Sequence, residues 1–510
     1  MQNYLPILPI HQTSNSMLRF NLFSLLFVAL CLAGIVFSSD LAAQTKKTHK
    51  LVAKERPNIV VILADDLGYA DLGFTGSKEI FTPNIDALAN NGVVFKNGYV
   101  THPYCGPSRA GLLTGRYQAR FGMEVNAAHS PDDPYMGLPV EELTFAKRMQ
   151  QAGYKTAVMG KWHMGSHPNF HPNNRGFDEF FGFLGGGHDY FPESVKVSSA
   201  EYSIALSRNG KPAQLNEYLT TAISKEAARF VSATEQPFMM YVAYNAPHSP
   251  LQATEQDLAK YQHIADLDRR TYAAMIDSMD QGVGRIVAAL KQSEKLHNTL
   301  IFFLSDNGGV YPEEWMPDSD WANNAPFRRG KVSLTEGGVH VPFIAHWPAG
   351  FSLKSEYAGL VSSLDIAATS LALARADVSQ AKLDGVNLLP HINGENPASP
   401  HPALFWRLEE ASDLWAVRTP EFKYLNQPLP GVGKSFFDMQ TDPYESHNLN
   451  GAMPKEQSEL ATLWNEWNKH NEQNILLQNE PYKMRRAEFY QTLYQAQLEK
   501  ALAAELQVIK

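Results

Sequence analysis

Five short hydrophobic runs, each ending abruptly at polar residues, mark the chain from residue 58 onward. Their hydrophobicity is nearly continuous, with little alternation between apolar and polar positions. Such runs are typical of strands buried on both faces, as in a parallel sheet. The runs span 58–64, 155–159, 237–244, 299–304 and 340–345.

Helix-like segments of about two to seven turns separate these runs. They cover residues 84–91, 141–152, 217–232, 267–292 and 363–374. Strands that alternate with helices imply right-handed crossovers and a sheet covered on both sides. The sequence therefore predicts an α/β fold in which a large mixed, mostly parallel sheet is sandwiched by helices, over residues 56–400.

The pattern of hydrophobic residues changes beyond about residue 400. Short aromatic runs at 404–409, 414–418 and 422–425 are joined by turn residues. They predict a smaller C-terminal α+β subdomain, residues 401–510, with a short antiparallel sheet. Its tail, 454–510, is rich in Gln, Glu, Leu and Ala and is predicted to be helical.

The N-terminus has the layout of an export signal. Arg19 precedes the apolar run 20–37, and small residues follow up to Ala43. This pattern predicts a signal peptide over 1–43 and a polar spacer over 44–55. The protein is thus expected in the periplasm or outside the cell. The apolar run is long, so an uncleaved membrane anchor is the alternative.

The amino-acid composition limits the kinds of partner that the protein is expected to bind. Of 510 residues, 44% are hydrophobic and 19% are charged, as in soluble globular proteins. The net charge of −9 gives no general attraction to nucleic acid or anionic lipid, so an anionic substrate needs a local basic pocket.

The chain contains too few cysteines to pair Cys105 after signal cleavage. The only two cysteines are Cys31 and Cys105, and signal cleavage would remove the first. An unpaired thiol in an oxidising compartment is either a buried, inert residue or a functional one.

Polar residues that bind metals or move protons follow four of the five hydrophobic runs. In parallel sheets, ligands bind at the carboxyl ends of the strands, so neighbouring strands would bring these groups into one cleft. Each residue alone could instead cap a helix or form a turn. The residues are Asp65, Asp66, Lys161, His163, His248, Asp306 and Asn307.

The stretch 105–116, Cys-Gly-Pro-Ser-Arg-Ala-Gly-Leu-Leu-Thr-Gly-Arg, carries the strongest signal. Pro107 suits the first turn of a helix, which places Cys105 just before it, where free backbone N–H groups favour an anionic atom. These residues allow an activated nucleophile at an anion site.

The same stretch resembles the signature of type I sulfatases, in the alkaline phosphatase superfamily. That signature is Cys-x-Pro-Ser-Arg followed by Leu-Thr-Gly-Arg. Further landmarks match in order, so that the likeness spans roughly residues 56–450 and is closest to bacterial carbohydrate sulfatases. They are Pro57-Asn58-Ile59 through Asp65-Asp66, Thr82 to Asp86, Gly160 to His163, Ala246-Pro247-His248, Ser305 to Gly308, Gly330-Lys331, Glu336-Gly337-Gly338, and Phe437-Asp438 with Asp442 to Glu445.

The resemblance implies that a maturation enzyme oxidises Cys105 to formylglycine (3-oxoalanine), whose hydrated aldehyde is the nucleophile. It also implies one divalent cation held by Asp65, Asp66, Asp306 and Asn307, together with residue 105. Oxygen ligands suit Ca²⁺ or Mg²⁺, and Ca²⁺ is preferred here.

By the same resemblance, Lys161 and Lys331 hold the sulfate oxygens, and Arg109 steadies residue 105 and its metal ligand. His248 donates a proton to the leaving oxygen, and His163 takes one from residue 105 as sulfate is eliminated.

The pocket rim should choose the substrate, for which a sulfated carbohydrate is expected. Candidate rim residues are His102, His188, Asp189, Trp315, Trp321, Arg328 and Arg329, of which the two arginines suit a further anionic group. Two alternatives remain. One is a phosphate or phosphonate ester hydrolase of the same superfamily, and the other is a non-catalytic binder of sulfated glycans with Cys105 unmodified.

Overall fold

The computed structural model describes residues 56–195, 204–312, 318–351, 355–408, 414–429 and 431–476. These residues fall in one compact unit that begins at Arg56. The predicted signal peptide and spacer, Trp315 and the end of the predicted helical tail lie outside the described residues. None of the helices within the described ranges has the length and apolar character needed to span a membrane.

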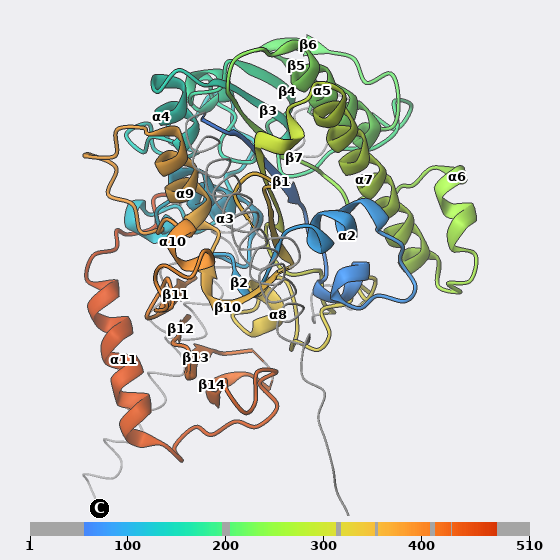
Figure 1. The fold of residues 1–510 in the computed structure, drawn as a ribbon. Helices are drawn as coiled ribbons and strands as arrows, with labels where there is room; N and C mark the ends of the chain where they lie inside the picture. Colours follow the sequence, from blue (N-terminus) through green and yellow to red (C-terminus); the bar gives the residue numbers. More distant parts are fainter. Residues whose placement is uncertain are drawn as a thin grey trace, which may run out of the picture. The chain divides into compact units, whose positions relative to one another are not determined.

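A ten-stranded sheet forms the centre of the larger part, in the order β10-β2-β9-β8-β1-β7-β3-β4-β5-β6 (Figure 1). Its middle strands β8, β1, β7, β3 and β4 are parallel neighbours. The hydrophobic runs predict the first four, whereas no run predicts β4. The strands are β1 (Asn58–Ala64), β2 (Val93–Tyr99), β3 (Lys155–Lys161), β4 (Glu179–Phe183), β5 (Leu206–Arg208), β6 (Lys211–Ala213), β7 (Phe238–Ala243), β8 (Thr299–Ser305), β9 (Phe343–His346) and β10 (Ser355–Ser362).

The fifth hydrophobic run behaves differently from the other four. A short helix, α8 (Glu336–Val339), ends before His340, and β9 begins only at Phe343. β9 is antiparallel to both β8 and β2. A parallel strand needs a crossover that returns the chain to the other end of the sheet, usually a helix. Within the described residues between β8 and β9, the only helix is the four-residue α8.

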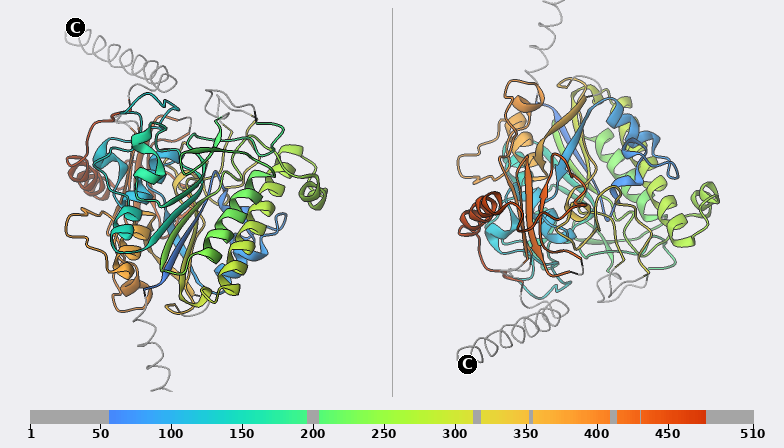
Figure 2. Two further views of the ribbon diagram at one scale, coloured as in Figure 1. Left: turned by 90° about the horizontal axis from the view of Figure 1, so that it is seen from above. Right: turned by 90° about the horizontal axis from the view of Figure 1, so that it is seen from below.

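Helices cover both faces of the sheet (Figure 2). Ile59, Val61 and Leu63 of β1 pack in one core with residues of α3, α4 and α9, whereas Val60 and Ile62 pack in another with α2, α5 and α7. Burial on both faces explains why the run lacks polar alternation. The helices are α2 (Pro83–Asn90), α3 (Cys105–Thr114), α4 (Phe145–Gln151), α5 (Leu219–Ala233), α6 (Glu255–Leu258), α7 (Leu267–Gln292), α9 (Leu364–Ala374) and α10 (Leu389–Ile392).

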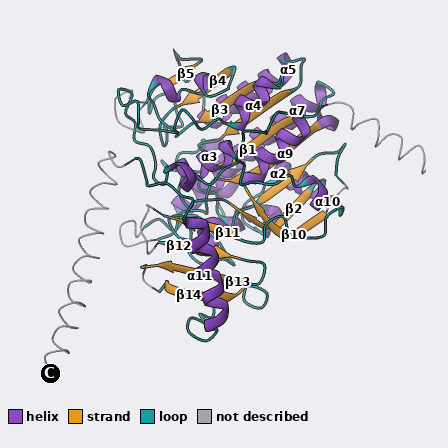
Figure 3. Ribbon diagram, turned by 90° about the vertical axis from the view of Figure 1, so that its left-hand side faces the viewer, coloured by secondary structure: helices purple, strands orange, loops and turns teal. Residues whose placement is uncertain are grey.

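The C-terminal part contains the predicted antiparallel sheet, in the order β11-β12-β13-β14 (Figure 3). Helix α11 (Pro454–Asn468) packs Trp464 and Trp467 into a core with Val417 and Phe436. The predicted boundary near residue 400 stays a prediction. The strands are β11 (Leu404–Arg407), β12 (Trp415–Arg418), β13 (Phe422–Gln427) and β14 (Gly433–Asp438).

Candidate active site

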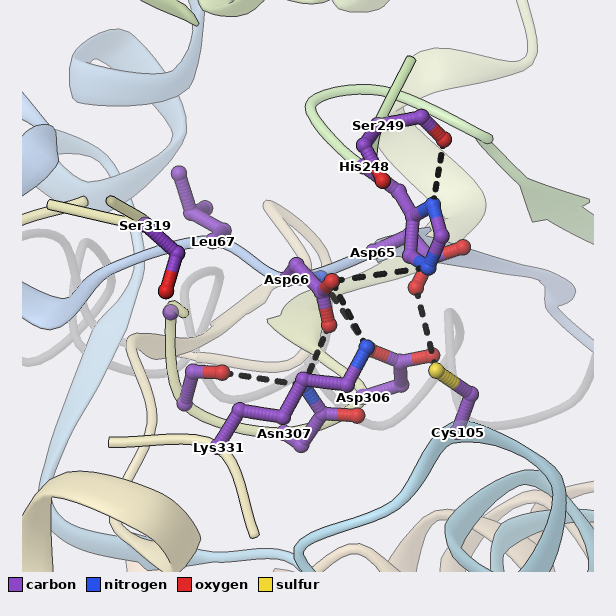
Figure 4. A network of polar contacts seen from close by, with 12 residues as sticks. Asp65, Asp66, Leu67, Cys105, His248, Ser249, Asp306, Asn307, Ser319 and Lys331 are labelled. Atoms are coloured by element: carbon purple, nitrogen blue, oxygen red, sulfur yellow. Dashed lines mark hydrogen bonds and ion pairs between the residues drawn. The ribbon is translucent and has the colours of Figure 1, made fainter. Parts of the chain in front are cut away.

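Neighbouring strands deliver polar residues to one end of the large sheet. Asp65 and Asp66 directly follow β1, Asp306 and Asn307 directly follow β8, and Lys161 is the last residue of β3. Because β8, β1, β7 and β3 are adjacent and parallel, their carboxyl ends lie side by side. The structure therefore brings these residues into one cluster, shown in part in Figure 4.

Cys105 is the first residue of α3 and is 1% exposed. The helix begins one residue earlier than the sequence predicts, because Tyr104 is its N-cap and Pro107 lies further into the first turn. The Cys105 thiol donates to Asp65 Oδ1 at 3.4 Å (Figure 4). Burial, and then the charge of Asp65, raise the pKa of this thiol. The unmodified residue is thus a neutral thiol, not the activated thiolate that the helix start allows.

The acidic residues and Asn307 form a continuous network. Asn307 Nδ2 donates to Asp66 Oδ1 at 2.7 Å, and the Asp66 amide donates to Asp306 Oδ1 at 3.3 Å. Asp66 has a left-handed backbone, with φ of 61°, which is uncommon outside glycine. Burial would raise the pKa of Asp66, but Lys331 and His248 outweigh it and hold the pKa well below its usual range. Burial and Asp65 raise the pKa of Asp306 to about 6.

This network fits a divalent cation. Ligand atoms of Asp65, Asp66, Cys105 and His248 all lie within 4.8 Å of one another. Asn307 Oδ1 is buried and has no hydrogen-bond partner among the described residues. Carboxylate and amide oxygens are the ligands that Ca²⁺ and Mg²⁺ prefer, so an ion here would satisfy an otherwise unmatched oxygen.

Three cationic side chains face the three carboxylates. Arg109 Nε and Nη2 lie 2.9 and 2.8 Å from Asp306 Oδ2, and Lys161 Nζ lies 2.5 Å from Asp65 Oδ2. Lys331 Nζ lies 2.7 Å from Asp66 Oδ2. Arg109 and Lys161 are fully buried, and the Lys331 side chain is 16% exposed. The charges balance, so an added divalent cation would make the site attractive to an anion.

His248 reaches the cluster from the loop after β7. Its Nδ1 lies 2.6 Å from the carbonyl oxygen of Ser249, which can only accept, so Nδ1 carries a proton. Its Nε2 faces Asp66 Oδ2 at 3.5 Å (Figure 4). Burial lowers the pKa of His248 to about 3, although Asp66 opposes the shift. The ring is neutral at pH 7 and presents the Nε2 lone pair to the site.

His163 follows Lys161 by two residues and is 3% exposed. It has φ of 59°, and its amide donates to the carbonyl oxygen of Leu184 at 3.2 Å. Histidine adopts the left-handed region more often than most residues, so this conformation by itself assigns no role. The role predicted for His163 stays a prediction.

The predicted rim residues spread over several environments. Arg328 donates to the carbonyl oxygen of Gly431, and the Arg329 guanidinium stacks over the Tyr311 ring at 5.5 Å. Both arginines thus contact other parts of the protein, and the substrate-binding role predicted for them stays a prediction. His102 and His188 are fully buried, Asp189 Oδ1 accepts from Gln252 Nε2 at 3.0 Å, and the Trp321 carbonyl oxygen accepts from Arg269 Nη1 at 2.9 Å.

Sequence reasoning missed residues that support the cluster from a distance. Asn126 Oδ1 accepts from the amide of Gly106 at 2.9 Å, and the Tyr190 hydroxyl donates to the carbonyl oxygen of His248 at 2.8 Å. Gln427 bonds the loop that carries Lys331. None of these three follows one of the five hydrophobic runs or lies in the signature stretch, so the sequence offers no signal for them.

Comparison with known proteins gives the class. The sulfatase family model matches residues 57–376, and a second model, described as the C-terminal part of N-sulphoglucosamine sulphohydrolase, matches residues 330–473. The chain therefore belongs to the sulfatase family.

Two named relatives are sulfatases, and a solved structure shares the fold. An N-acetylgalactosamine-6-sulfatase from Canis lupus familiaris is 33% identical over 73% of this chain and 72% of that protein. The corresponding protein from Mus musculus is 34% identical over 81% of this chain and 79% of that protein. The crystal structure of Ps i-CgsB in complex with k-i-k-neocarrahexaose has a TM-score of 0.76 and 40% identity, and covers 82% of this chain and 94% of that one. The protein is a sulfuric ester hydrolase.

Proposed function

We propose that this enzyme removes sulfate from a sulfated carbohydrate, using a formylglycine made from Cys105 and one bound Ca²⁺. The observation that carries the proposal is the position of Cys105. The sole cysteine of the sulfatase signature lies against Asp65, within a cluster of three carboxylates and three cations. The carbohydrate part is supported by the names of the relatives, which act on galactosamine sulfate or were solved with a carrageenan oligosaccharide.

The modification of Cys105 accounts for a thiol that is otherwise badly placed. A neutral, buried thiol is a weak nucleophile, because only the thiolate attacks efficiently. A hydrated aldehyde at this position supplies a hydroxyl nucleophile together with a second hydroxyl for the release of sulfate. Since Cys105 is buried in the folded protein, a maturation enzyme must act before folding is complete, which fits modification during export.

Asp65, Asp66, Asp306 and Asn307 would hold the metal ion. Their oxygens suit Ca²⁺ and Mg²⁺, and a buried site built largely from carboxylates suits Ca²⁺, because Mg²⁺ gives up its water ligands more reluctantly. A bound cation would neutralise charge on the sulfate oxygens and favour ionisation of a nearby hydroxyl.

The surrounding side chains have complementary tasks. Lys161 and Lys331 would bind sulfate oxygens, since both ammonium groups are buried or nearly so and point at the metal ligands. Arg109 would keep Asp306 ionised and oriented through its two contacts. His248 would give a proton to the leaving sugar oxygen from Nε2, and a bound sulfate anion would favour its protonated form. His163 would accept a proton from residue 105.

The setting of the reaction is also part of the proposal. An exported enzyme, periplasmic or extracellular, would meet polysaccharide sulfates there. The negative overall charge would not itself recruit the polymer, so the basic groups of the site must.

The decisive experiment combines mass spectrometry with a substrate comparison. The protein is produced together with a formylglycine-generating enzyme, and the peptide that contains residue 105 is analysed. We expect aldehyde at residue 105, and rates on nitrophenyl sulfate well above those on nitrophenyl phosphonates. A panel of defined sulfated oligosaccharides then identifies the sugar. An intact thiol at residue 105 in a fully active preparation would refute the proposal, and faster phosphonate hydrolysis would favour the phosphonate esterase instead.

A further inference from the structure

The loop that carries Lys331 contains a backbone conformation that its own sequence disfavours. Val332 has φ of 78°, in the left-handed region. For a β-branched side chain this is a genuine outlier, which persists only when surrounding contacts fix it. The amide of Ser333 donates to the carbonyl oxygen of Gly330 at 3.1 Å, so a turn within the loop accounts for part of this conformation, and contacts with other segments add to it.

Contacts with three other segments hold the loop at this point, two through the backbone and one through a side chain. The Lys331 amide donates to the carbonyl oxygen of Gly309 at 2.9 Å, and the Val332 amide donates to that of Pro103 at 3.2 Å. These anchor the loop to the chain after Asn307 and to the chain before Cys105. Both anchors come from connections of the large sheet, and neither of them involves the carbonyl oxygen of Val332.

Gln427 supplies that third contact from the C-terminal sheet. It is the last residue of β13 and is 3% exposed. Its Nε2 donates to the carbonyl oxygen of Val332 at 3.0 Å, and its Oε1 accepts from the amide of Leu334 at 2.8 Å. One side-chain amide thus satisfies a carbonyl and an amide on either side of Ser333, as a neighbouring strand would.

We propose that Gln427 is a positioning residue for Lys331, through which the C-terminal sheet fixes the geometry of the sulfate-binding site. Its amide clamps the loop around the strained Val332 and so holds the Lys331 ammonium 2.7 Å from Asp66 Oδ2. The inference rests on the proposed role of Lys331 in sulfate binding. Small displacements of a binding group are costly to turnover, because transition-state contacts depend steeply on position.

The test is a double-mutant cycle on the matured, full-length enzyme with nitrophenyl sulfate. Gln427→Leu keeps the approximate size but removes both hydrogen bonds, and we expect kcat/KM to fall about 10²-fold. In a Lys331→Ala background the same change should cost less than about threefold, because the group that it positions is gone. A purely structural role would instead lower activity by the same factor in both backgrounds.

Gln457→Leu is the matched control. Gln457 is also buried in the C-terminal part, accepts from the amide of Gly451 at 3.0 Å and donates to Asn450 Oδ1 at 2.8 Å. It should lower the melting temperature by a similar amount without the loss of kcat/KM. If Gln427→Leu does not fold, Gln427→Glu keeps the acceptor for Leu334 and loses only the donor to Val332.

The outcomes distinguish the positioning role of Gln427 from the sulfate-binding role of Lys331. Loss of activity on Lys331→Ala, with none on Gln427→Leu or Gln427→Glu, would overturn the positioning role alone. Equal losses for the Gln427 and Gln457 variants would overturn it as well. Full activity of Lys331→Ala would instead remove the proposed role of Lys331 and the inference with it.

Discussion

Two of the buried charge clusters among the described residues invite comparison, because one has the features of an active site and the other does not. The catalytic cluster comprises Asp65, Asp66, Asp306, Arg109, Lys161 and Lys331. The α8 cluster comprises Glu336, His340, Lys423 and Glu445. In the second, Lys423 Nζ lies 2.8 Å from both Glu336 Oε1 and Glu445 Oε1, and the Glu336 amide donates to Glu445 Oε2 at 2.9 Å.

The electrostatics of the two clusters are similar. Burial would raise the pKa of Glu336, but Lys423 outweighs it and lowers the pKa, as Lys331 does for Asp66. In each cluster a second acid has a raised pKa, first because of burial: Asp306 in one, Glu445 in the other. Perturbed pKa values therefore do not distinguish a reactive site from a structural one here.

The difference lies in what remains unmatched. The catalytic cluster adjoins the Cys105 sulfur and the buried Asn307 Oδ1, which has no partner among the described residues. The α8 cluster joins the C-terminal sheet to the short helix behind the site, since Lys423 and Glu445 come from that part of the chain and Glu336 from α8. The catalytic cluster is incomplete without ligands, whereas the α8 cluster joins two segments of the chain.

The largest expected effect is the loss of the nucleophile. Cys105→Ala should reduce turnover by about 10⁴-fold or more, because no other group in the site can replace residue 105. Its free energy of unfolding should change by only about 1 kcal/mol, since little side-chain volume is removed. Initial rates and chemical denaturation check the two halves of the prediction. Undiminished activity would exclude Cys105 as the source of the nucleophile.

Metal removal should come next in size. Exhaustive chelation should lower activity by about 10³-fold, given that a bound cation contributes several kcal/mol to transition-state stabilisation. Ca²⁺ should restore it better than Mg²⁺. Added Ca²⁺ should also raise the melting temperature, and Asn307→Leu should abolish that rise by removing the unmatched oxygen. Full activity after chelation would contradict the cation assignment.

The α8 cluster should respond in stability instead. Lys423→Met leaves Glu336 and Glu445 buried beside each other without their shared cation, and should cost about 3–5 kcal/mol in free energy of unfolding. Molecules that remain folded should keep a comparable kcat. Lys434→Met, on the exposed side of β14, is the matched control and should change stability little. A loss of turnover without a loss of stability would end the distinction between the clusters.

The sequence predicted most of what lies on the middle strands. The runs before Asp65, Lys161 and Asp306 are continuous and buried on both faces. Both the strands and the polar residues at their ends could therefore be predicted from the sequence. The strands β2, β4, β5, β6 and β10 were not predicted. β2 contains Lys96 and Asn97, the first half of β10 is partly exposed, and β5 and β6 are only three residues long. A strand with exposed polar positions lacks the double burial that makes a hydrophobic run continuous.

Supporting residues were beyond the reach of sequence patterns. Gln427 meets Val332 across about a hundred positions of the chain, and Lys423 meets Glu336 across almost as many. A neighbour in space leaves no trace in local periodicity, whereas a residue at a strand end does. The nucleophile and metal ligands could therefore be proposed from the sequence, but not the contacts that hold them.

The smallest expected effect concerns a buried ion pair outside both clusters. His401 Nε2 lies 2.8 Å from Asp365 Oδ1. Burial alone would lower the pKa of His401, but the charge and hydrogen bond of Asp365 outweigh it, so the pKa is raised above 6.5. The folded protein then binds this proton more tightly than the unfolded chain does. The resulting stabilisation is complete below the unfolded pKa and disappears as pH rises through the folded pKa.

His401→Asn should therefore lower the free energy of unfolding by about 1.5 kcal/mol at about pH 6 and by clearly less at about pH 9, with kcat unchanged at both. His391→Asn is the matched control, because His391 Nδ1 contacts the backbone carbonyl oxygen of Ala398 instead of a carboxylate. Denaturation curves at the two pH values measure the difference. If the substitution affects only stability, and more at about pH 6 than at about pH 9, buried charge alone does not make a functional site in this fold. A change in kcat would instead connect this distant pair to catalysis.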